Sequence, residues 1–367
     1  MKNYFVLKLM LFVCLFFMLF ACGTTKEYKV VKPAFYYWQT RMSFYNDEEK
    51  ILDSLSVKKM YVRFFDVSYN EVQAAIPIAP LEHDLEYFNR PIYDDSLKKY
   101  LPHTAFEIVP TVFIVNGVFE KLNEQQSKEL ALKIYTKIKA KMKDIKPENV
   151  FVKELQMDCD WTATTKERYF LFLKTLKQIA FDKSKLKISA TIRLHQYKNF
   201  AKTGVPPTDK GMLMFYNLTD LRKPTAKNSI LDISEMKKYL IDETYPLPLD
   251  AALPLFSWSV LFRGEECLQV FDELAYLREG KLAFMKEIAA NRYEAQTDTV
   301  YQNFYFREGD IIKVEEVSNA ILLEAAELLK TQKYSQDTLT ISLFHFDRAI
   351  VSHYTVPVLK DVFKKLD

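Results

Sequence analysis

Residues 151–161, Phe-Val-Lys-Glu-Leu-Gln-Met-Asp-Cys-Asp-Trp, join an apolar strand-like run to two carboxylates that lie two positions apart. Side chains alternate in direction along a β-strand, so this spacing predicts that Asp158 and Asp160 point to the same side. Two acids on one face repel each other and resist burial unless they serve proton chemistry, bind a cation or meet an arginine. The end of this strand is therefore the leading candidate for a functional site.

Further strand-like runs accompany this one, and amphipathic segments separate them. The predicted strands cover residues 34–40, 59–67, 107–115, 150–161, 187–195, 212–218, 251–258 and 340–347. The predicted helices cover residues 47–54, 124–143, 166–181, 234–240, 266–277, 317–330 and 356–366. Strands with two apolar faces that alternate with such helices indicate a parallel sheet wrapped by helices, and eight units of this kind predict an α/β fold, the (β/α)8 barrel. A doubly wound open sheet is the alternative, although no strand is followed by a glycine-rich phosphate-binding turn.

One stretch interrupts the alternation of strands and helices. Residues 293–314 contain short strand-like runs around a turn at residues 308–310, Glu-Gly-Asp. We expect a small β insertion before the last strand, carried by the barrel and not forming a separate domain.

The first residues have the pattern of an export signal. Lys2 and Lys8 are followed by an apolar run over residues 9–21 that is too short to span a bilayer comfortably. The run closes on Leu-Phe-Ala-Cys, residues 19–22, which resembles the lipobox of bacterial lipoproteins. In such proteins cleavage precedes the cysteine and the new N-terminus takes up lipid. An ordinary signal peptide and an uncleaved anchor are the alternatives.

These features predict the organisation and the location of the chain. We expect a signal peptide at residues 1–21, a lipid on Cys22, a tether at residues 22–32 and the barrel at residues 33–367. The predicted location is the cell envelope of a Gram-negative bacterium, with the lipid holding the protein to a membrane, expected to be the outer membrane. Whether the barrel faces the periplasm or the exterior is open.

Charge and cysteine content narrow the classes of partner. The formal net charge is +3, and removal of Lys2 and Lys8 with the signal leaves +1, which gives no indication of nucleic-acid binding. Cys159 and Cys267 are the cysteines of the predicted folded part. They either pair in an oxidising compartment or, as we favour, remain two buried thiols. Neither has a Cys or His nearby at metal-binding spacing, so neither a structural metal nor a cofactor is predicted.

Polar and aromatic residues stand at the ends of nearly all the predicted strands, the face that carries the active site in barrels of this kind. They are Trp38, Gln39, Arg41, Arg63, Asp66, Asn116, Asp158, Asp160, Trp161, Arg193, His195, Gln196, Tyr216, Asn217, Trp258, His345 and Asp347. Some of them are expected to cap helices or to pair across the rim.

We assign roles to a subset of these residues. The candidate catalytic residues are Asp158, Asp160 and Asp347, and the candidate substrate-binding residues are Arg63, Trp161, Arg193, His195, Tyr216, Trp258 and His345. An arginine opposite two aspartates would keep one carboxylate charged and leave the other to carry a proton, as in an acid/base pair. The alternative is a buried Asp–Arg pair that only fixes the barrel geometry, and a cation between the two aspartates is a further possibility.

Two expectations concern single side chains near this strand. Glu154 has the same parity as Asp158 one pleat deeper, so we expect it to meet a lysine or an arginine in the barrel floor. Trp161, Tyr216 and Trp258 offer ring faces on which a sugar can stack, although an aromatic residue in a strand often belongs to the core.

The fourth predicted strand resembles the signature of glycoside hydrolase family 18, the chitinase-like barrels, which reads Asp-x-x-Asp-x-Asp-x-Glu and ends on the glutamate that protonates the glycosidic oxygen. This chain reads Leu155-x-x-Asp158-x-Asp160-x-Thr162, so the two central aspartates match and the catalytic glutamate is replaced by Thr162. The family also carries a tyrosine at the end of the sixth strand and a tryptophan at the end of a late strand, which Tyr216 and Trp258 resemble. An uncharacterised group of bacterial lipoproteins with the same kind of barrel is a closer resemblance, and it spans residues 33–367.

The resemblance implies a glycan or oligosaccharide as the ligand. The mechanism of the family needs a proton donor, so it cannot run with Thr162 in that position. Either Asp160 has become the acid, with Asp158 or Asp347 as its partner, in a hydrolase of another linkage, or the barrel binds sugar without catalysis. A third interpretation is an envelope assembly factor, which an exposed apolar helix face would favour.

Overall fold

The computed structural model describes residues 28, 30–44, 46–70, 74–78, 82–83, 92–94, 98–101, 105–143, 149–271, 282–301 and 303–367. The expected signal peptide, the lipid site and residues 23–27 and 29 of the expected tether lie outside these residues. Residues 30–32 of the expected tether belong to the first barrel strand, which begins at Val30 and not at residue 33. Within the described part of the chain, no helix is both long enough and apolar enough to cross a membrane.

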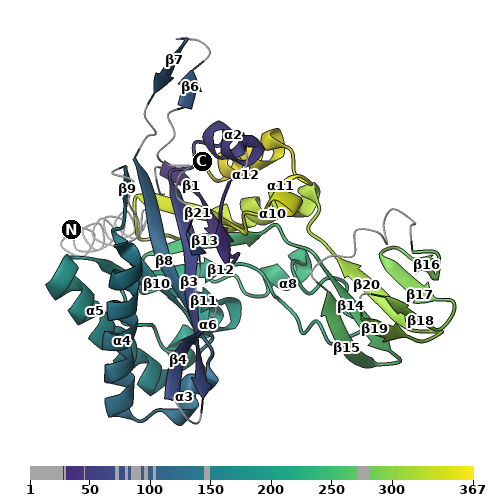
Figure 1. Ribbon diagram of the computed structural model, residues 1–367, viewed down its shortest axis with the longest axis horizontal. Coiled ribbons are helices and arrows are strands. Elements are labelled where there is room, and N and C mark those ends of the chain that lie inside the picture. The colour runs from purple at the N-terminus through teal and green to yellow at the C-terminus, as the bar shows by residue number, and fades with distance from the viewer. Residues whose placement is uncertain are drawn as a thin grey trace, which may run out of the picture.

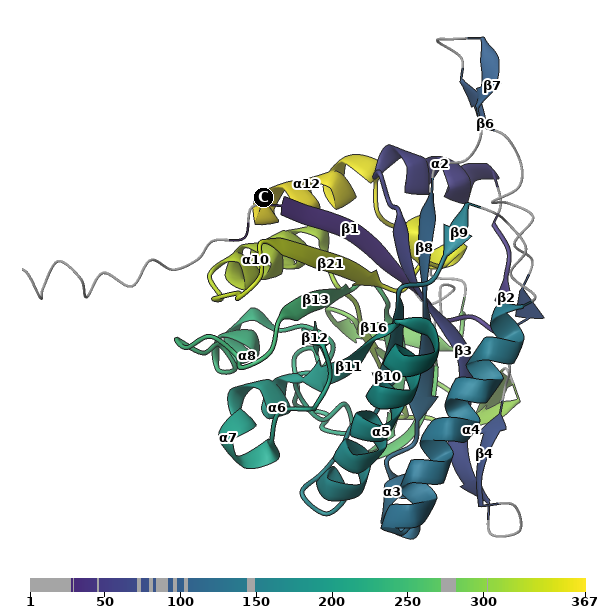
Figure 2. The same ribbon diagram turned by 90° about the vertical axis from the view of Figure 1, so that its left-hand side faces the viewer.

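Parallel strands close into a barrel in which each strand pairs with its neighbour in the chain order (Figures 1 and 2). The strands are β1 (Val30–Tyr37), β3 (Lys59–Asn70), β8 (Phe106–Ile114), β10 (Glu154–Asp158), β11 (Lys187–Arg193), β12 (Lys210–Met214), β13 (Leu249–Pro254) and β21 (Thr338–Phe344). The pairing of β21 with β1 closes the ring. The predicted (β/α)8 barrel is therefore confirmed, and each predicted barrel strand has a counterpart.

Helices cover the outside of this barrel. They are α2 (Asn46–Ser54), α3 (Gly117–Lys121), α4 (Glu124–Met142), α5 (Lys166–Ser184), α6 (Leu194–Lys198), α7 (Phe200–Thr203), α8 (Ile233–Lys237), α10 (Asn319–Lys330), α11 (Arg348–Val351) and α12 (Val356–Leu366). In α4, Leu130, Ile134 and Ile138 recur every four residues and are buried on one face. Strands such as β13 are buried at every position because one face meets the barrel interior and the other meets the helices.

Short strands decorate the barrel. They are β2 (Arg41–Met42), β4 (Ala74–Ile78), β5 (Glu82–His83), β6 (Ile92–Asp94), β7 (Lys99–Leu101) and β9 (Val150–Phe151). Between β4 and β8 only separate pieces of the chain are described, and the hairpin of β6 and β7 stands out from the barrel in both views (Figures 1 and 2).

An antiparallel sheet is inserted between β13 and β21 and projects to one side of the barrel (Figure 1). Its strands are β14 (Trp258–Arg263), β15 (Glu266–Phe271), β16 (Met285–Ala289), β17 (Arg292–Ala295) and β20 (Ile311–Glu315), and a hairpin of β18 (Thr299–Tyr301) and β19 (Phe304–Phe306) accompanies them. The insertion is thus larger than the expected range of residues 293–314, since it begins at Trp258 and ends at Glu315.

The helix predicted at residues 266–277 is wrong over residues 266–271, which form strand β15, and residues 272–277 lie outside the described part of the chain. Gly264 adopts a positive φ of 60° in the turn that joins β14 to β15. A bulge in this pair shifts the register around Leu268. As a result Leu268 and Phe271 both pack on the core of the sheet although they are three residues apart. A spacing of three is typical of a helix, and this is why the sequence pattern misled.

Charged side chains fill the barrel at its N-terminal end. The carboxylate of Glu154 is buried, accepts a hydrogen bond of 2.8 Å from Lys59 Nζ and lies 3.0 Å from Lys210 Nζ. Lys210 also pairs with Asp250. The lysine expected opposite Glu154 is therefore present, and there are two. Burial alone would raise the pKa of the Glu154 carboxyl, but Lys210 and Lys59 together hold it below its usual value.

We expect this carboxylate to make the fold sensitive to acid. A carboxyl whose pKa is lowered by folding adds stability above its unfolded pKa, about 4.3, and that stability is lost as the pH falls through the folded pKa. Glu154→Gln should therefore be less stable than the parent at neutral pH and should lose less stability between about pH 5 and pH 3. Urea unfolding over this range measures the difference, with the exposed Glu167→Gln as the control. Parallel pH profiles for Glu154→Gln and the parent would contradict the expectation.

Candidate functional site

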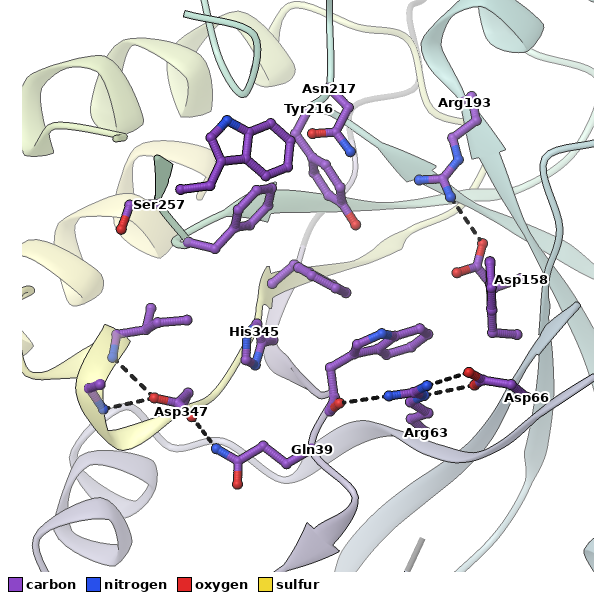
Figure 3. A pocket seen from close by; sticks show the side chains of 17 residues that line it. Gln39, Arg63, Asp66, Asp158, Arg193, Tyr216, Asn217, Ser257, His345 and Asp347 are labelled. Carbon is purple, nitrogen blue, oxygen red and sulfur yellow. Dashed lines mark hydrogen bonds and ion pairs between the residues drawn. The ribbon is translucent and has the colours of Figure 1, made fainter. Parts of the chain in front are cut away.

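A cavity of about 680 Å³ lies at the C-terminal ends of the barrel strands (Figure 3). Its aromatic lining consists of Trp38, Phe113, Tyr216, Phe256, Trp258 and Phe344. Its polar lining consists of Gln39, Arg63, Asp66, Asp158, Arg193, Asn217, Ser257, His345 and Asp347. The parallel strands bring these residues together because their carboxyl ends meet at one end of the barrel.

A second cavity of about 410 Å³ adjoins the first. Arg193, Tyr216 and Asn217 line both cavities, whereas Asp160 and His195 line only the second. The two hollows therefore form one bipartite groove, with Arg193 and Tyr216 at the boundary.

Asp158 is the last residue of β10 and is buried at the cavity wall. One of its carboxylate oxygens accepts a hydrogen bond of 2.6 Å from the Thr191 hydroxyl and one of 3.4 Å from Arg193 (Figure 3). Burial alone would lower the pKa of the Arg193 guanidinium, but Asp158 and the other acidic groups around it, including Asp160, together raise it. Asp158 is thus arranged as an acceptor paired with a permanent cation.

Asp160 follows the end of β10 and does not share the environment of Asp158. Its side chain is 54% exposed, accepts a hydrogen bond of 3.2 Å from Gln196 and lies 3.8 Å from His195 Nε2. The expected acid/base pair on one strand face is therefore not what the geometry provides, since each aspartate lines a different cavity with its own partners. The strand ends at Asp158, and the alternation of side chains ends with it.

The remaining carboxylates of the first cavity are also engaged. Arg63 holds Asp66 through two hydrogen bonds in a fork, and its guanidinium lies 5.6 Å from the ring of Trp38 (Figure 3). Asp347 caps the N-terminus of α11 by accepting from two backbone amides, and its second oxygen accepts from Gln39. Asp347 therefore positions a helix at the rim, and both of its carboxylate oxygens are engaged as hydrogen-bond acceptors.

Aromatic rings make up one side of the cavity. Tyr216, Phe256 and Phe344 pack against one another with ring centroids 5.4–5.8 Å apart, and Phe256 also contacts Trp258 at 5.2 Å. Burial raises the pKa of the Tyr216 phenol in spite of the opposing charge of Arg193, so its hydroxyl stays protonated at neutral pH. His345 follows β21 and also lines the cavity (Figure 3).

Trp161 is a correction to the expected site. The indole is 1% exposed, stacks on Tyr169 of α5 at 5.7 Å and donates a hydrogen bond of 3.1 Å to the carbonyl of Thr203. It lines neither cavity and belongs to the core between the barrel and its helices. Thr162, at the position of the family's catalytic glutamate, is exposed and hydrogen bonds to Thr164 and Thr165, so it also lies outside both cavities.

A buried ion pair that the sequence reasoning missed supports the cavity from behind. Lys313 and Glu315 of β20 pair at 2.6 Å in the interior. The other oxygen of Glu315 accepts a hydrogen bond of 2.7 Å from the Trp258 indole and 3.0 Å from the backbone amide of Ser229. Glu315 thus joins the inserted sheet, the loop after β12 and the cavity wall. The alternation of Lys313 and Glu315 with the apolar Ile312 and Val314 places both charges on one face of the strand, but the same pattern is typical of a solvent-exposed face, so it does not reveal that the pair is buried.

Two further predictions concern cysteine and metal. Cys159 and Cys267 are both free thiols, Cys159 buried and Cys267 partly exposed. Within the residues that the structure describes, no group of three or more His, Cys, Asp or Glu side chains is placed to hold a metal ion.

Solved structures of known proteins share this fold, whereas no family model matches the chain and a search of curated proteins finds no match. The spore cortex-lytic enzyme SleL of Bacillus megaterium QM B1551 aligns with a TM-score of 0.52 at 10% identity, over 93% of this chain and 75% of SleL. SleL of Bacillus cereus gives a TM-score of 0.52 at 13% identity, over 92% and 75%. A chitinase from Chromobacterium violaceum gives 0.47 at 11% identity, over 90% and 98%. At these identities the likeness to the SleL structures concerns the fold alone, which is the (β/α)8 barrel.

Proposed function

We propose that this protein is a lipid-anchored, glycan-binding protein of the bacterial cell envelope, which holds an oligosaccharide in the bipartite groove at the C-terminal end of its barrel. The observation that carries the proposal is the combination, in one cavity of about 680 Å³, of an aromatic wall with fixed polar groups. Sugars offer apolar ring faces and hydroxyl groups, and such a cavity meets both. The lipobox-like sequence ending at Cys22 supports the anchor and the envelope location, with the outer membrane as the proposed membrane.

Binding is favoured over hydrolysis because the carboxylates of the first cavity already have hydrogen-bonding partners within the protein. Asp66 and Asp158 are each held by an arginine, and Asp347 caps a helix. A general acid must deliver a proton to the glycosidic oxygen, whereas these three groups serve as acceptors of hydrogen bonds. The residue at the family's acid position, Thr162, lines neither cavity.

Hydrolysis is the second candidate function, and one observation favours it. Asp160 is half exposed in the second cavity, with His195 at 3.8 Å. This is an arrangement in which a carboxylate and an imidazole can exchange a proton with a ligand. The assembly-factor alternative receives less support, because the large exposed apolar residues of the described helices are Leu132 on α4 and Phe181 on α5, and Lys185 covers the ring of Phe181.

Asp160→Asn separates binding from hydrolysis. We expect the parent to bind members of a panel of chito-oligosaccharides and peptidoglycan fragments without releasing new reducing ends. We expect the variant to bind the same members with affinity changed by no more than about twofold, as for an exposed substitution worth about 0.5 kcal/mol. Calorimetry and a reducing-end assay measure the two properties. Turnover that disappears in Asp160→Asn would establish a hydrolase instead, and no binding to any member of the panel would count against the glycan proposal.

A further inference from the structure

The chain enters the barrel at the end opposite the groove. The Tyr28 hydroxyl donates a hydrogen bond of 2.5 Å to the carbonyl of Leu366, and the Val31 amide donates one of 3.3 Å to Asp367. Val30 pairs with Thr338, the first residue of β21, and β1 begins beside the C-terminus (Figure 2). We call this end of the barrel, where strands begin and helices end, the basal face.

The distance from the lipid site to the basal face is limited by the chain itself. Five residues lie between Cys22 and Tyr28. The six Cα–Cα steps that join the two, at about 3.5 Å each, reach at most about 20 Å. A domain of this length is about 50 Å across. A lipid on Cys22 therefore keeps the basal face close to the membrane. Because the tether is shorter than the domain, the mouth of the groove cannot face the same membrane.

The basal face is rich in exposed lysines. A short segment leads into each barrel strand, from the last residue of the helix before it to the first residue of the strand. The described parts of these segments, together with the residue after α12, contain nine exposed lysines and four exposed carboxylates. The lysines are Lys58, Lys143, Lys153, Lys185, Lys187, Lys237, Lys238, Lys330 and Lys333, and the carboxylates are Asp242, Glu243, Asp337 and Asp367. Lysines near a helix end also complement the helix dipole. Lys58 and Lys187, however, stand at strand starts, where that explanation does not apply.

We propose that the basal face rests on an anionic phospholipid surface, so that the groove and the inserted sheet point away from the membrane. The proposal depends on the lipid at Cys22, which is part of the proposed function. The charge of the surface matches the occupant, because lysines are attracted to anionic headgroups over about a Debye length, roughly 8–10 Å at physiological salt. The tether holds the lysines within reach. In this orientation the groove binds a glycan that is displayed away from the bilayer. The headgroups of the membrane that carries the protein are then excluded as ligands.

Position-specific quenching tests this orientation in the lipidated protein. A fluorophore is placed on Lys187→Cys, at the basal face, or on Lys227→Cys, in the loop that follows β12 at the mouth, each combined with Cys267→Ser to remove the partly exposed thiol. The protein is inserted into vesicles of phosphatidylcholine with phosphatidylglycerol that contain a headgroup-quenched lipid. We expect quenching several-fold stronger at position 187 than at position 227. We expect the difference to shrink when phosphatidylglycerol is left out or when salt is raised.

A charge variant provides the matched control. Two triple variants are compared with a label placed at Lys58→Cys. Quenching of this label should weaken in the basal variant, which combines Lys185→Gln, Lys187→Gln and Lys333→Gln. It should stay unchanged in the mouth-side variant, which combines Lys121→Gln, Lys223→Gln and Lys227→Gln. Equal quenching at positions 187 and 227, or equal effects of the two triple variants, would overturn the basal-face proposal and leave the lipid anchor standing. A parent protein that does not partition into either vesicle, or a Cys22→Ser variant that partitions as well as the parent, would overturn the anchor and the orientation together.

Discussion

Replacing Glu315 by glutamine is expected to lower the free energy of unfolding by about 3 kcal/mol, because the ammonium group of Lys313 then loses its buried counter-charge. Both side chains lie in the interior, at 2% and 1% exposure for Lys313 and Glu315. The remaining partners of the ammonium group would be the carbonyl oxygens of Lys223 and Ala226, at 3.4 Å and 3.3 Å. Glutamine still accepts hydrogen bonds from Trp258 and Ser229, so the substitution isolates the loss of charge.

Urea unfolding followed by circular dichroism measures this effect. Glu266→Gln, at an exposed position of the neighbouring strand β15, is the matched control and should change stability by no more than about 0.5 kcal/mol. Combining Lys313→Met with Glu315→Leu should restore part of the loss, since no isolated charge is then left in the interior. A Glu315→Gln protein as stable as the parent would mean that the pair is not buried in solution.

Removing the Trp258 side chain is expected to weaken glycan binding about thirty-fold, equivalent to about 2 kcal/mol, the effect of truncating an aromatic anchor at the centre of a binding site. Trp258→Phe keeps a ring face and gives up the hydrogen bond to Glu315, so its loss of affinity should be smaller. Trp161→Phe is the control, because Trp161 lies in the core outside both cavities.

Calorimetric titration measures the affinity of each variant for the panel member that the parent protein binds most tightly. The ranking expected from the structure is Trp258→Ala weaker than Trp258→Phe, and Trp258→Phe weaker than Trp161→Phe, which should bind as the parent does. If Trp258→Ala binds as well as the parent, the cavity is not the binding site.

The barrel could be predicted from the sequence because the patterns that indicate its strands and helices are short and recur along the chain. Each strand is a short apolar run and each long helix repeats apolar residues every four positions, as in α4. The inserted sheet was harder to predict, because a bulge near Leu268 breaks the alternation on which strand recognition depends. The short strand-like runs and the turn at residues 293–314 predicted part of the inserted sheet, but they did not show that the sheet begins as early as Trp258.

The residues of the groove were predictable as a group and less so individually. Their position after strand ends suffices to gather residues such as Arg63, Arg193, Tyr216 and His345 around one cavity. Trp161 lies three residues beyond the end of β10, so strand alternation does not place its side chain, and its burial in the core depends on packing against α5. The separation of Asp158 from Asp160 depends on where the strand stops, which composition does not reveal.

The inserted sheet enters and leaves the barrel through strands that pair with each other, and Trp258 stands opposite Glu315 in that pairing. The described residues between these two form a module with adjoining ends, closed at its base by the pair that supports the cavity wall. Lineages that descend from such a barrel can lengthen, trim or exchange the module without disturbing the barrel. Ligand preference beyond the cavity can then diverge while the inner site is inherited unchanged.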